Sequence, residues 1–357
     1  MAQLRILVVD DAVVMRKLIT ETLRQDPELE VVGTAANGRI ALQKITQVNP
    51  DLLTLDLEMP EMDGLTTLQE LRKLYPDLPV IIFSTLSQKG AAATLDALAL
   101  GANDYVTKPA NVGSVTEAME RLEQELIPKI KAHCHRRMPV PGVPAPVAPA
   151  FPAAPAAGAA PARVEMVCIG TSTGGPNALA EVFRNLPADF PVPLVVVQHM
   201  PPMFTAMLAE RLNSHSPVRC HEGADGQPVE RGHAYLAPGG HHLEVTRTAA
   251  GPRLRVHDGP MENSCRPAVD VLFRSVAANY GRTALGVIMT GMGQDGLRGC
   301  QLLREQGSRI IAQDEASSIV WGMPGVVAQA GYADKVLPLN LIAREITRQA
   351  RNGRAPI

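Results

Sequence analysis

A proline-rich segment divides this chain into two parts. From Pro139 to Pro161 there are eight prolines, no charged residue and otherwise almost only Ala, Val and Gly. Such a density of proline removes helical hydrogen bonds throughout, so a polyproline-II spacer with a reach of roughly 70 Å is expected. The 357 residues are enough for a folded domain on each side of it.

Both parts alternate short apolar runs with helix-like periodic stretches, the pattern of βα units around a parallel sheet. The first part contains five such runs, LRILVVD, EVVGTA, DLLTLDL, PVIIFST and NDYVTK. The second contains EMVCIG, PLVVVQH, TALGVIMTG and SRIIAQD. Between them, residues 218–258 hold shorter runs broken by Gly and Pro, which predict inserted β-hairpins. The fold class is therefore α/β, with a second domain that is doubly wound and mostly parallel.

Composition excludes several classes of function. A net charge of −2 and a pI near 6.5 give no electrostatic footprint for nucleic acid, and an aromatic content of 3% with no basic helix-turn-helix pattern argues against a DNA-binding output. Five scattered cysteines without a CxxC pair suit a reduced compartment, so a cytoplasmic protein is expected. Neither a signal peptide nor a run of about eighteen apolar residues is found, and no membrane insertion is expected.

Charged residues end three predicted strands of the first part. Asp10 and Asp11 end the first, Asp56 the third and Lys108 the fifth. These side chains should converge, because ligands of open parallel sheets bind beyond the carboxyl ends of the strands. Three carboxylates there need a cation, and all-oxygen ligation suits Mg²⁺, with Asp56 as the nucleophile that accepts a phosphoryl group. For Asp11 alone, a helix N-cap or turn is the favoured interpretation.

Residues 4–125 resemble a response-regulator receiver. The resemblance rests on Asp10 and Asp11, the acceptor in LTLDLEMPEMDG, the hydroxyl of Ser84, and Lys108 in VTKP. It implies a (βα)₅ domain that a chemotaxis histidine kinase phosphorylates on Asp56.

The same resemblance implies roles for further residues. Mg²⁺ would be held in the acidic set of Asp10, Asp11 and Asp56, together with the backbone of Glu58. Ser84 would bond to the phosphoryl group, with Thr85 at the same strand end as its rival, and Tyr105 would be the aromatic residue whose position reports phosphorylation.

In the second part, residues 170–175 read Gly-Thr-Ser-Thr-Gly-Gly between an apolar strand and a helix. The pattern G-x-S-x-G in a strand–turn–helix exposes Ser172 as a nucleophile. His199 follows the strand PLVVVQ, and Asp295 follows ALGVIM, so all three should meet at one sheet edge. There Ser172 would attack, His199 would move the proton and Asp295 would fix the imidazole.

A dinucleotide site is the alternative. Gly291, Gly293 and Gly296 spell G-x-G-x-x-G after a strand, with Asp314 eighteen residues beyond. On spacing alone the two hypotheses are about equal. Context favours hydrolysis, because such fingerprints usually open their domain and this one would leave Ser172 without a purpose.

The second part also resembles the catalytic domain of chemotaxis protein-glutamate methylesterases (CheB family). The motifs are IGTSTGGP, VVQHMPPMFTAMLAERLN, APGGHHLEV, CRPAVDVLFRSVA, VIMTGMGQDG and DEASSIVWGMP. The resemblance implies the same roles for Ser172, His199 and Asp295. It adds the backbone N–H of Met292 to the oxyanion site, where the turn geometry already suggests that of Thr173.

These resemblances imply a reaction and its control. The substrates would be glutamate γ-methyl esters, and certain glutamines, on chemoreceptor cytoplasmic helices, with no cofactor in the catalytic domain. The unphosphorylated receiver would inhibit that domain. The expected boundaries are 1–125 for the receiver, 126–162 for the linker and 163–350 for the catalytic domain.

Overall fold

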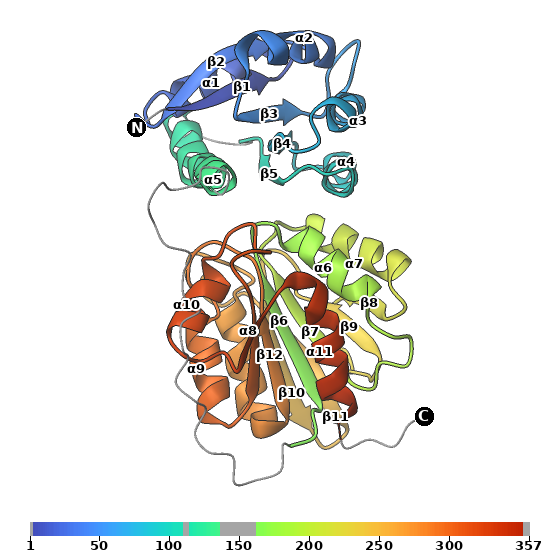
Figure 1. The fold of residues 1–357 in the computed structure, drawn as a ribbon. Helices are drawn as coiled ribbons and strands as arrows, with labels where there is room; N and C mark the ends of the chain where they lie inside the picture. Colours follow the sequence, from blue (N-terminus) through green and yellow to red (C-terminus); the bar gives the residue numbers. More distant parts are fainter. Residues whose placement is uncertain (1–2, 110–113, 136–161, 353–357) are drawn as a thin grey trace. The chain divides into compact units, whose positions relative to one another are not determined.

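The computed structural model describes residues 3–109, 114–135 and 162–352, which belong to two compact units (Figure 1). The proline-rich segment from Pro139 to Pro161 lies outside the described residues. Within the described ranges, no helix is both long enough and apolar enough to cross a membrane.

The first unit is built on a five-stranded sheet. Its strands are β1 (Leu4–Val9), β2 (Leu29–Ala35), β3 (Leu52–Asp56), β4 (Val80–Ser84) and β5 (Asp104–Thr107). Their order is β2-β1-β3-β4-β5 and every neighbouring pair is parallel. All five coincide with apolar runs of the sequence. Because the chain passes from β2 across β1 to β3, the strand order reverses between β1 and β3, which places a crevice at their carboxyl ends.

Five helices accompany this sheet. They are α1 (Val13–Leu23), α2 (Gly38–Val48), α3 (Gly64–Leu74), α4 (Gln88–Ala99) and α5 (Val115–His135). Helices α2, α3 and α4 each begin with a capping residue whose side chain accepts a hydrogen bond from a backbone N–H of the first turn. The capping residues are Asn37, Asp63 and Ser87 respectively. Helix α1 packs on α5, and α3 packs on both α2 and α4.

Helix α5 continues past residue 125, where the receiver was expected to end. It runs ten residues further, into the range expected for the linker. The cause is hydrophobic burial, since Leu126, Ile127, Ile130 and Cys134 all belong to the core of the first unit. The core of the first unit therefore includes residues of α5 beyond residue 125.

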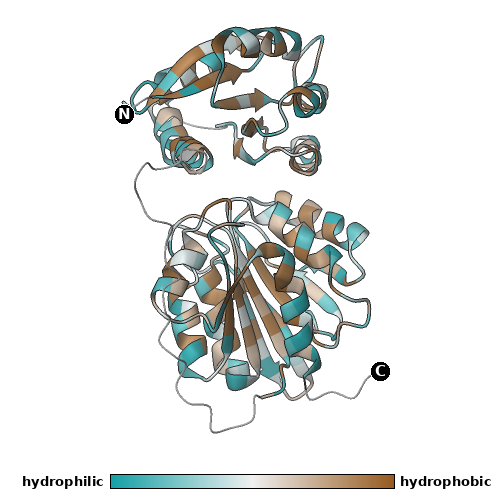
Figure 2. Cartoon of the chain, viewed as in Figure 1, coloured by the Kyte–Doolittle hydropathy of each residue, from teal (hydrophilic) through white to brown (hydrophobic). Residues whose placement is uncertain are grey.

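The second unit contains a seven-stranded parallel sheet. Its strands are β6 (Met166–Thr171), β7 (Leu194–Gln198), β8 (Arg219–Glu222), β9 (His233–Leu236), β12 (Ala284–Ile288), β13 (Arg309–Gln313) and β14 (Lys335–Leu337). They are ordered β14-β13-β12-β6-β7-β9-β8. The order reverses between β6 and β12, so the carboxyl ends of these strands flank a crevice. Figure 2 shows hydrophobic residues concentrated on the strands and hydrophilic ones on outer helix faces.

The region expected to hold hairpins contains one. Strands β10 (His242–Thr248) and β11 (Gly251–His257) pair antiparallel, whereas β8 and β9 join the main sheet as parallel strands. The helices are α6 (Gly175–Arg184), α7 (Phe204–His215), α8 (Val269–Tyr280), α9 (Leu297–Glu305), α10 (Met323–Gln329) and α11 (Leu339–Arg351), with a 3₁₀ turn η1 (Gly281–Thr283). Helix α6 packs on α7 and α11, and α9 packs on α8 and α10.

The extension of α5 generates a stability prediction. Leu126 is fully buried, so Leu126→Ala in the full chain should destabilise the first unit by about 2–5 kcal/mol through lost burial and a residual cavity. Glu123→Ala, at an exposed position of the same helix, should change stability by less than about 0.5 kcal/mol. Denaturant unfolding followed by circular dichroism measures both. Equal effects would show that α5 does not pack as described.

Candidate active site

The turn after β6 fixes the backbone of Ser172. Its N–H donates to the carbonyl oxygen of Thr290 at 3.0 Å, and its own carbonyl accepts from Gly175 N at 2.8 Å and Gln198 Nε2 at 2.9 Å. Gly174 adopts a left-handed conformation with φ of +75°, which a residue with a side chain rarely takes. The half-buried Ser172 therefore lies on a rigid turn at the carboxyl edge of the sheet.

His199 leaves the neighbouring strand at the same level. The register pairs Thr171 of β6 with Gln198 of β7, so Ser172 and His199 directly follow a paired position. The His199 Nε2 lies 2.8 Å from Asp295 Oδ2. A carboxylate can only accept, so Nε2 carries the proton and Nδ1 is the basic nitrogen of the neutral ring. Within the described residues, no hydrogen bond joins the Ser172 hydroxyl to the ring.

Asp295 is the most heavily bonded side chain of the site. Besides His199, its carboxylate accepts from Val269 N at 2.6 Å, Asp270 N at 3.0 Å and Asn263 Nδ2 at 2.8 Å. The two backbone donors are the first residues of α8, whose positive dipole end favours an anion. Burial alone would raise the pKa of Asp295, but the bonds from His199 and these N–H groups outweigh it and lower the pKa. Asp295 is therefore held as a carboxylate.

The environment of His199 favours its charged form. Burial by itself lowers the pKa of the imidazole, but the hydrogen bond to Asp295 and the contact with the Cys265 thiol outweigh it and raise the pKa to about 9. The Cys265 Sγ lies 3.6 Å from Nδ1, the ring nitrogen opposite Asp295. The imidazole thus lies between a carboxylate and a thiol, and both sides fix its orientation.

The backbone amides named for the oxyanion also lie near Ser172. Thr173 follows it, and a Cβ built on Gly291 would lie 2.8 Å from the Ser172 Cβ, so the loop of Met292 passes close to the serine. Within the described residues, the N–H groups of Thr173 and Met292 have no acceptor. Gly293 is left-handed, with φ of +83°, which lets the loop turn at this point.

Sequence reasoning missed three residues of this site. Asn263, Cys265 and Asp270 contact the His199–Asp295 pair or its supports. The sequence offered only a family motif that contains Cys265 and Asp270 and begins after Asn263. The three residues come from a loop and a helix start, which carry no strand-end signal.

The first unit brings its own charged residues together. Lys108 Nζ lies 2.9 Å from Asp10 Oδ2 and 2.8 Å from Asp56 Oδ2. Oxygens of Asp10, Asp11 and Asp56 lie within 4.8 Å of one another, an all-oxygen set of the kind that Mg²⁺ prefers. Burial and then the charge of Asp10 raise the pKa of Asp56 against the opposing effect of Lys108, so a further cation there would relieve the repulsion.

The other residues expected in this pocket differ in their surroundings. The Ser84 hydroxyl donates to the carbonyl of Gly90 at 3.0 Å, while the rival Thr85 bonds to another side-chain hydroxyl. Glu58 donates its N–H to Asp56 Oδ1 at 3.3 Å, and its carboxylate pairs with Lys89. Tyr105 is buried on β5.

The raised pKa of His199 determines how the free energy of unfolding changes with pH. The folded protein binds the imidazole proton more tightly than the unfolded chain does. This contribution to stability is therefore complete below about pH 6.5 and is lost as pH rises through about 9. We expect NMR titration of the full chain to give a pKa near 9. Asp295→Asn should lower it toward 6.5, and Cys265→Ser should lower it less. A wild-type value near 6.5 would contradict this electrostatic account.

Comparisons with known proteins find relatives for both units. Residues 167–346 match the family model "CheB methylesterase", and residues 6–120 match "Response regulator receiver domain". A protein-glutamate methylesterase/protein-glutamine glutaminase of Trichodesmium erythraeum is 52% identical, over 98% of this chain and 99% of its own length. One from Nocardioides is 51% identical, over 98% and 96%.

A solved structure also resembles the second unit. The CheB methylesterase catalytic domain of Thermotoga maritima is 41% identical, with a TM-score of 0.51, and the match covers 52% of this chain and 99% of that one. The chain therefore belongs to the CheB methylesterase family and carries a response-regulator receiver in front of its catalytic domain.

Proposed function

We propose that this chain hydrolyses glutamate γ-methyl esters, and deamidates certain glutamines, on the cytoplasmic helices of chemoreceptors. The observation that carries the proposal is the bonded pair of His199 and Asp295 at the sheet edge where the turn presents Ser172. The names of relatives that match almost the whole chain support the substrate class.

In this reaction Ser172 Oγ attacks the ester carbonyl while His199 Nδ1 takes its proton. The new C–O bond makes a tetrahedral intermediate, whose oxyanion the N–H groups of Thr173 and Met292 would stabilise. The imidazolium then protonates the leaving methoxide as methanol, and water hydrolyses the acyl-serine by the reverse proton path. Asp295 keeps the ring oriented throughout, and the same steps with ammonia as leaving group account for deamidation.

The receiver is proposed to control this activity through phosphorylation of Asp56 by a histidine kinase. Asp10, Asp11, Asp56 and the backbone of Glu58 would hold Mg²⁺, which supplies charge neutralisation for phosphoryl transfer. Lys108 Nζ, 2.8 Å from Asp56 Oδ2, would stabilise the charge on that carboxylate.

Two further residues would register the phosphoryl group. Ser84 would turn its hydroxyl from Gly90 toward the modified Asp56, and Tyr105 would follow that change.

Loss of the proposed nucleophile should abolish activity. Ser172→Ala is expected to lower methanol release from methylated receptor membranes by at least about 10³-fold, because the covalent intermediate cannot form. Ser214→Ala, on an exposed part of α7, serves as the matched control and should leave the rate unchanged. Activity of the Ser172 variant within a few-fold of wild type would exclude the serine-hydrolase mechanism and favour a domain that only binds a partner.

The control by phosphorylation predicts opposite effects of two changes. A fragment that begins at Arg163 should be more active than the intact unphosphorylated chain, because inhibition by the receiver is removed. Asp56→Ala should hold the intact chain at its basal rate with phosphodonor and Mg²⁺ present, whereas Asp77→Ala, at an exposed position, should remain activatable. A fragment slower than the basal enzyme would mean that the receiver activates the catalytic domain instead of covering it.

A further inference from the structure

A strained turn lies beside the His199–Asp295 pair. Glu262 and Cys265 exchange backbone hydrogen bonds at 3.2 and 2.9 Å around two central residues. These are Asn263 and Ser264, with φ of +52° and +60°, a left-handed conformation that costs free energy for residues with a side chain. Such strain persists where the surrounding structure enforces it, often next to a functional site.

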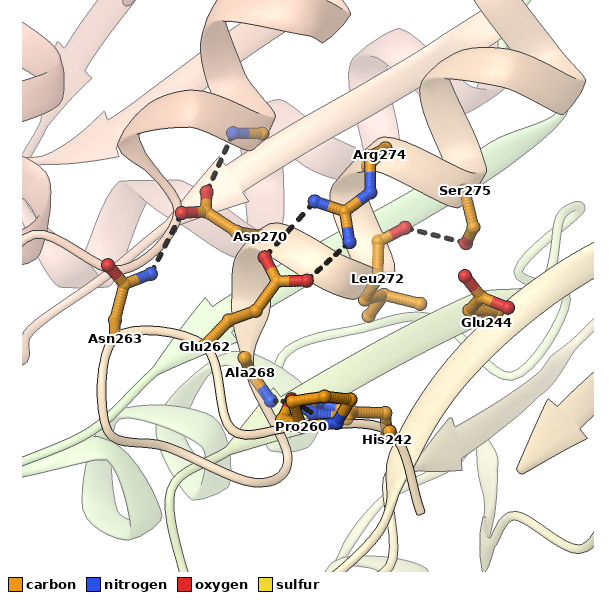
Figure 3. A network of polar contacts seen from close by, with 12 residues as sticks. His242, Glu244, Pro260, Glu262, Asn263, Ala268, Asp270, Leu272, Arg274 and Ser275 are labelled. Carbon is orange, nitrogen blue, oxygen red and sulfur yellow. Dashed lines mark hydrogen bonds and ion pairs between the residues drawn. The ribbon is translucent and has the colours of Figure 1, made fainter. Parts of the chain in front are cut away.

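The surroundings do hold this turn firmly (Figure 3). The Glu262 carboxylate accepts hydrogen bonds from both terminal guanidinium nitrogens of Arg274 in α8, at 2.6 and 3.1 Å. On the hairpin side, His242 Nε2 donates to the carbonyl of Pro260 at 2.9 Å and its Nδ1 accepts from Ala268 N at 3.3 Å. The turn is thus fastened to α8 at one side and to β10 at the other.

The turn places the side-chain amide of Asn263 between the carboxylates of Asp270 and Asp295. Asn263 Nδ2 donates to Asp295 Oδ1 at 2.8 Å and to Asp270 Oδ2 at 2.9 Å. Asp270 is itself fixed, because its other oxygen accepts from Gly299 N at 2.7 Å. Two buried acids side by side repel each other, and a shared donor with two N–H groups holds both in place.

We infer that Asn263 is a positioning residue that acts through Asp295. Asp295 Oδ2 faces His199 and Val269 N, so the rotation of the carboxylate about its axis depends on what holds Oδ1. Oδ1 has two donors, Asp270 N and Asn263 Nδ2. Without the amide, Oδ1 keeps one donor and the imidazole loses part of its orientation. This inference rests on the proposed hydrolase function.

Asn263→Gly in the full chain is the direct test, because glycine removes the amide and keeps the left-handed turn without strain. We expect kcat for methanol release from methylated receptor membranes to fall about tenfold with KM unchanged within about twofold. The rate of methanol release should rise with pH as the His199 imidazolium loses its proton, and in the variant this rise should lie at higher pH, because a less bonded Asp295 holds the imidazolium more strongly. Ser264→Gly, the other left-handed position of the turn, should change neither quantity.

A double-mutant cycle separates positioning from a general structural effect. In an Asp295→Asn background, Asn263→Gly should lower kcat by less than about twofold, since its route of action is gone. A tenfold fall in both backgrounds, or no fall in the wild type, would overturn the inference. Asn263→Asp covers the case in which the glycine variant unfolds. It preserves size but cannot donate when ionised, so a rate within about twofold of wild type would also overturn the inference.

These outcomes are distinct from failure of the proposed function. If Ser172→Ala retains activity, the hydrolase mechanism fails and the inference about Asn263 fails with it. If Ser172→Ala is inactive while Asn263→Gly behaves as wild type, the hydrolase proposal stands and only the role of Asn263 is rejected.

Discussion

The Asp295 carboxylate is the interaction on which the catalytic edge depends. It joins four separate segments of the chain: the end of β7 through His199, the first residues of α8, the turn of Asn263, and its own loop after β12. A buried carboxylate is costly unless every oxygen is bonded. Because one group satisfies donors from the other three segments, the position of α8 and the orientation of the imidazole are set together.

The receiver meets a similar requirement with a lysine in addition to backbone N–H donors, which come from Ala12 to Asp10 and from Glu58 to Asp56. Asp10 and Asp56 are buried together, and Lys108 bonds to both. In each unit the charged cluster lies where the strand order reverses, because only there do neighbouring loops diverge enough to leave side chains a shared crevice. The difference is in the supply of positive charge. Around Asp295 the donors are the first N–H groups of α8 and the side-chain amide of Asn263, which are permanent parts of the chain. In the receiver, three acids face a single lysine, an arrangement that suits an exchangeable metal ion.

The sequence was informative wherever strand ends decide position. Parallel strands in register bring their next residues to one edge, so Ser172, His199 and Asp295, like Asp10, Asp56 and Lys108, could be placed together from the sequence alone. Asn263 and Asp270 could not, because their approach to Asp295 depends on how a loop and a helix pack. The same limit explains β8 and β9, whose short runs broken by glycine are equally compatible with hairpins and with edge strands of a parallel sheet. The extent of α5 beyond residue 125 could not be read from the sequence, because its buried face is defined by the core that it covers.

The raised pKa of His199 has a consequence for how such a site works near neutral pH. With its pKa raised well above neutral, the imidazole is mostly charged at pH 7. In the proposed mechanism this loss in available base is partly offset, because a stronger base would accept the serine proton more readily, and the imidazolium formed would be the acid that the leaving methoxide requires. The bond to Asp295 therefore cannot be judged by its effect on the free base alone. It leaves Nδ1 as the basic nitrogen of the neutral ring, and in the proposed mechanism it would support the charge that the ring carries between the two proton transfers, so orientation and charge stabilisation would come from a single contact.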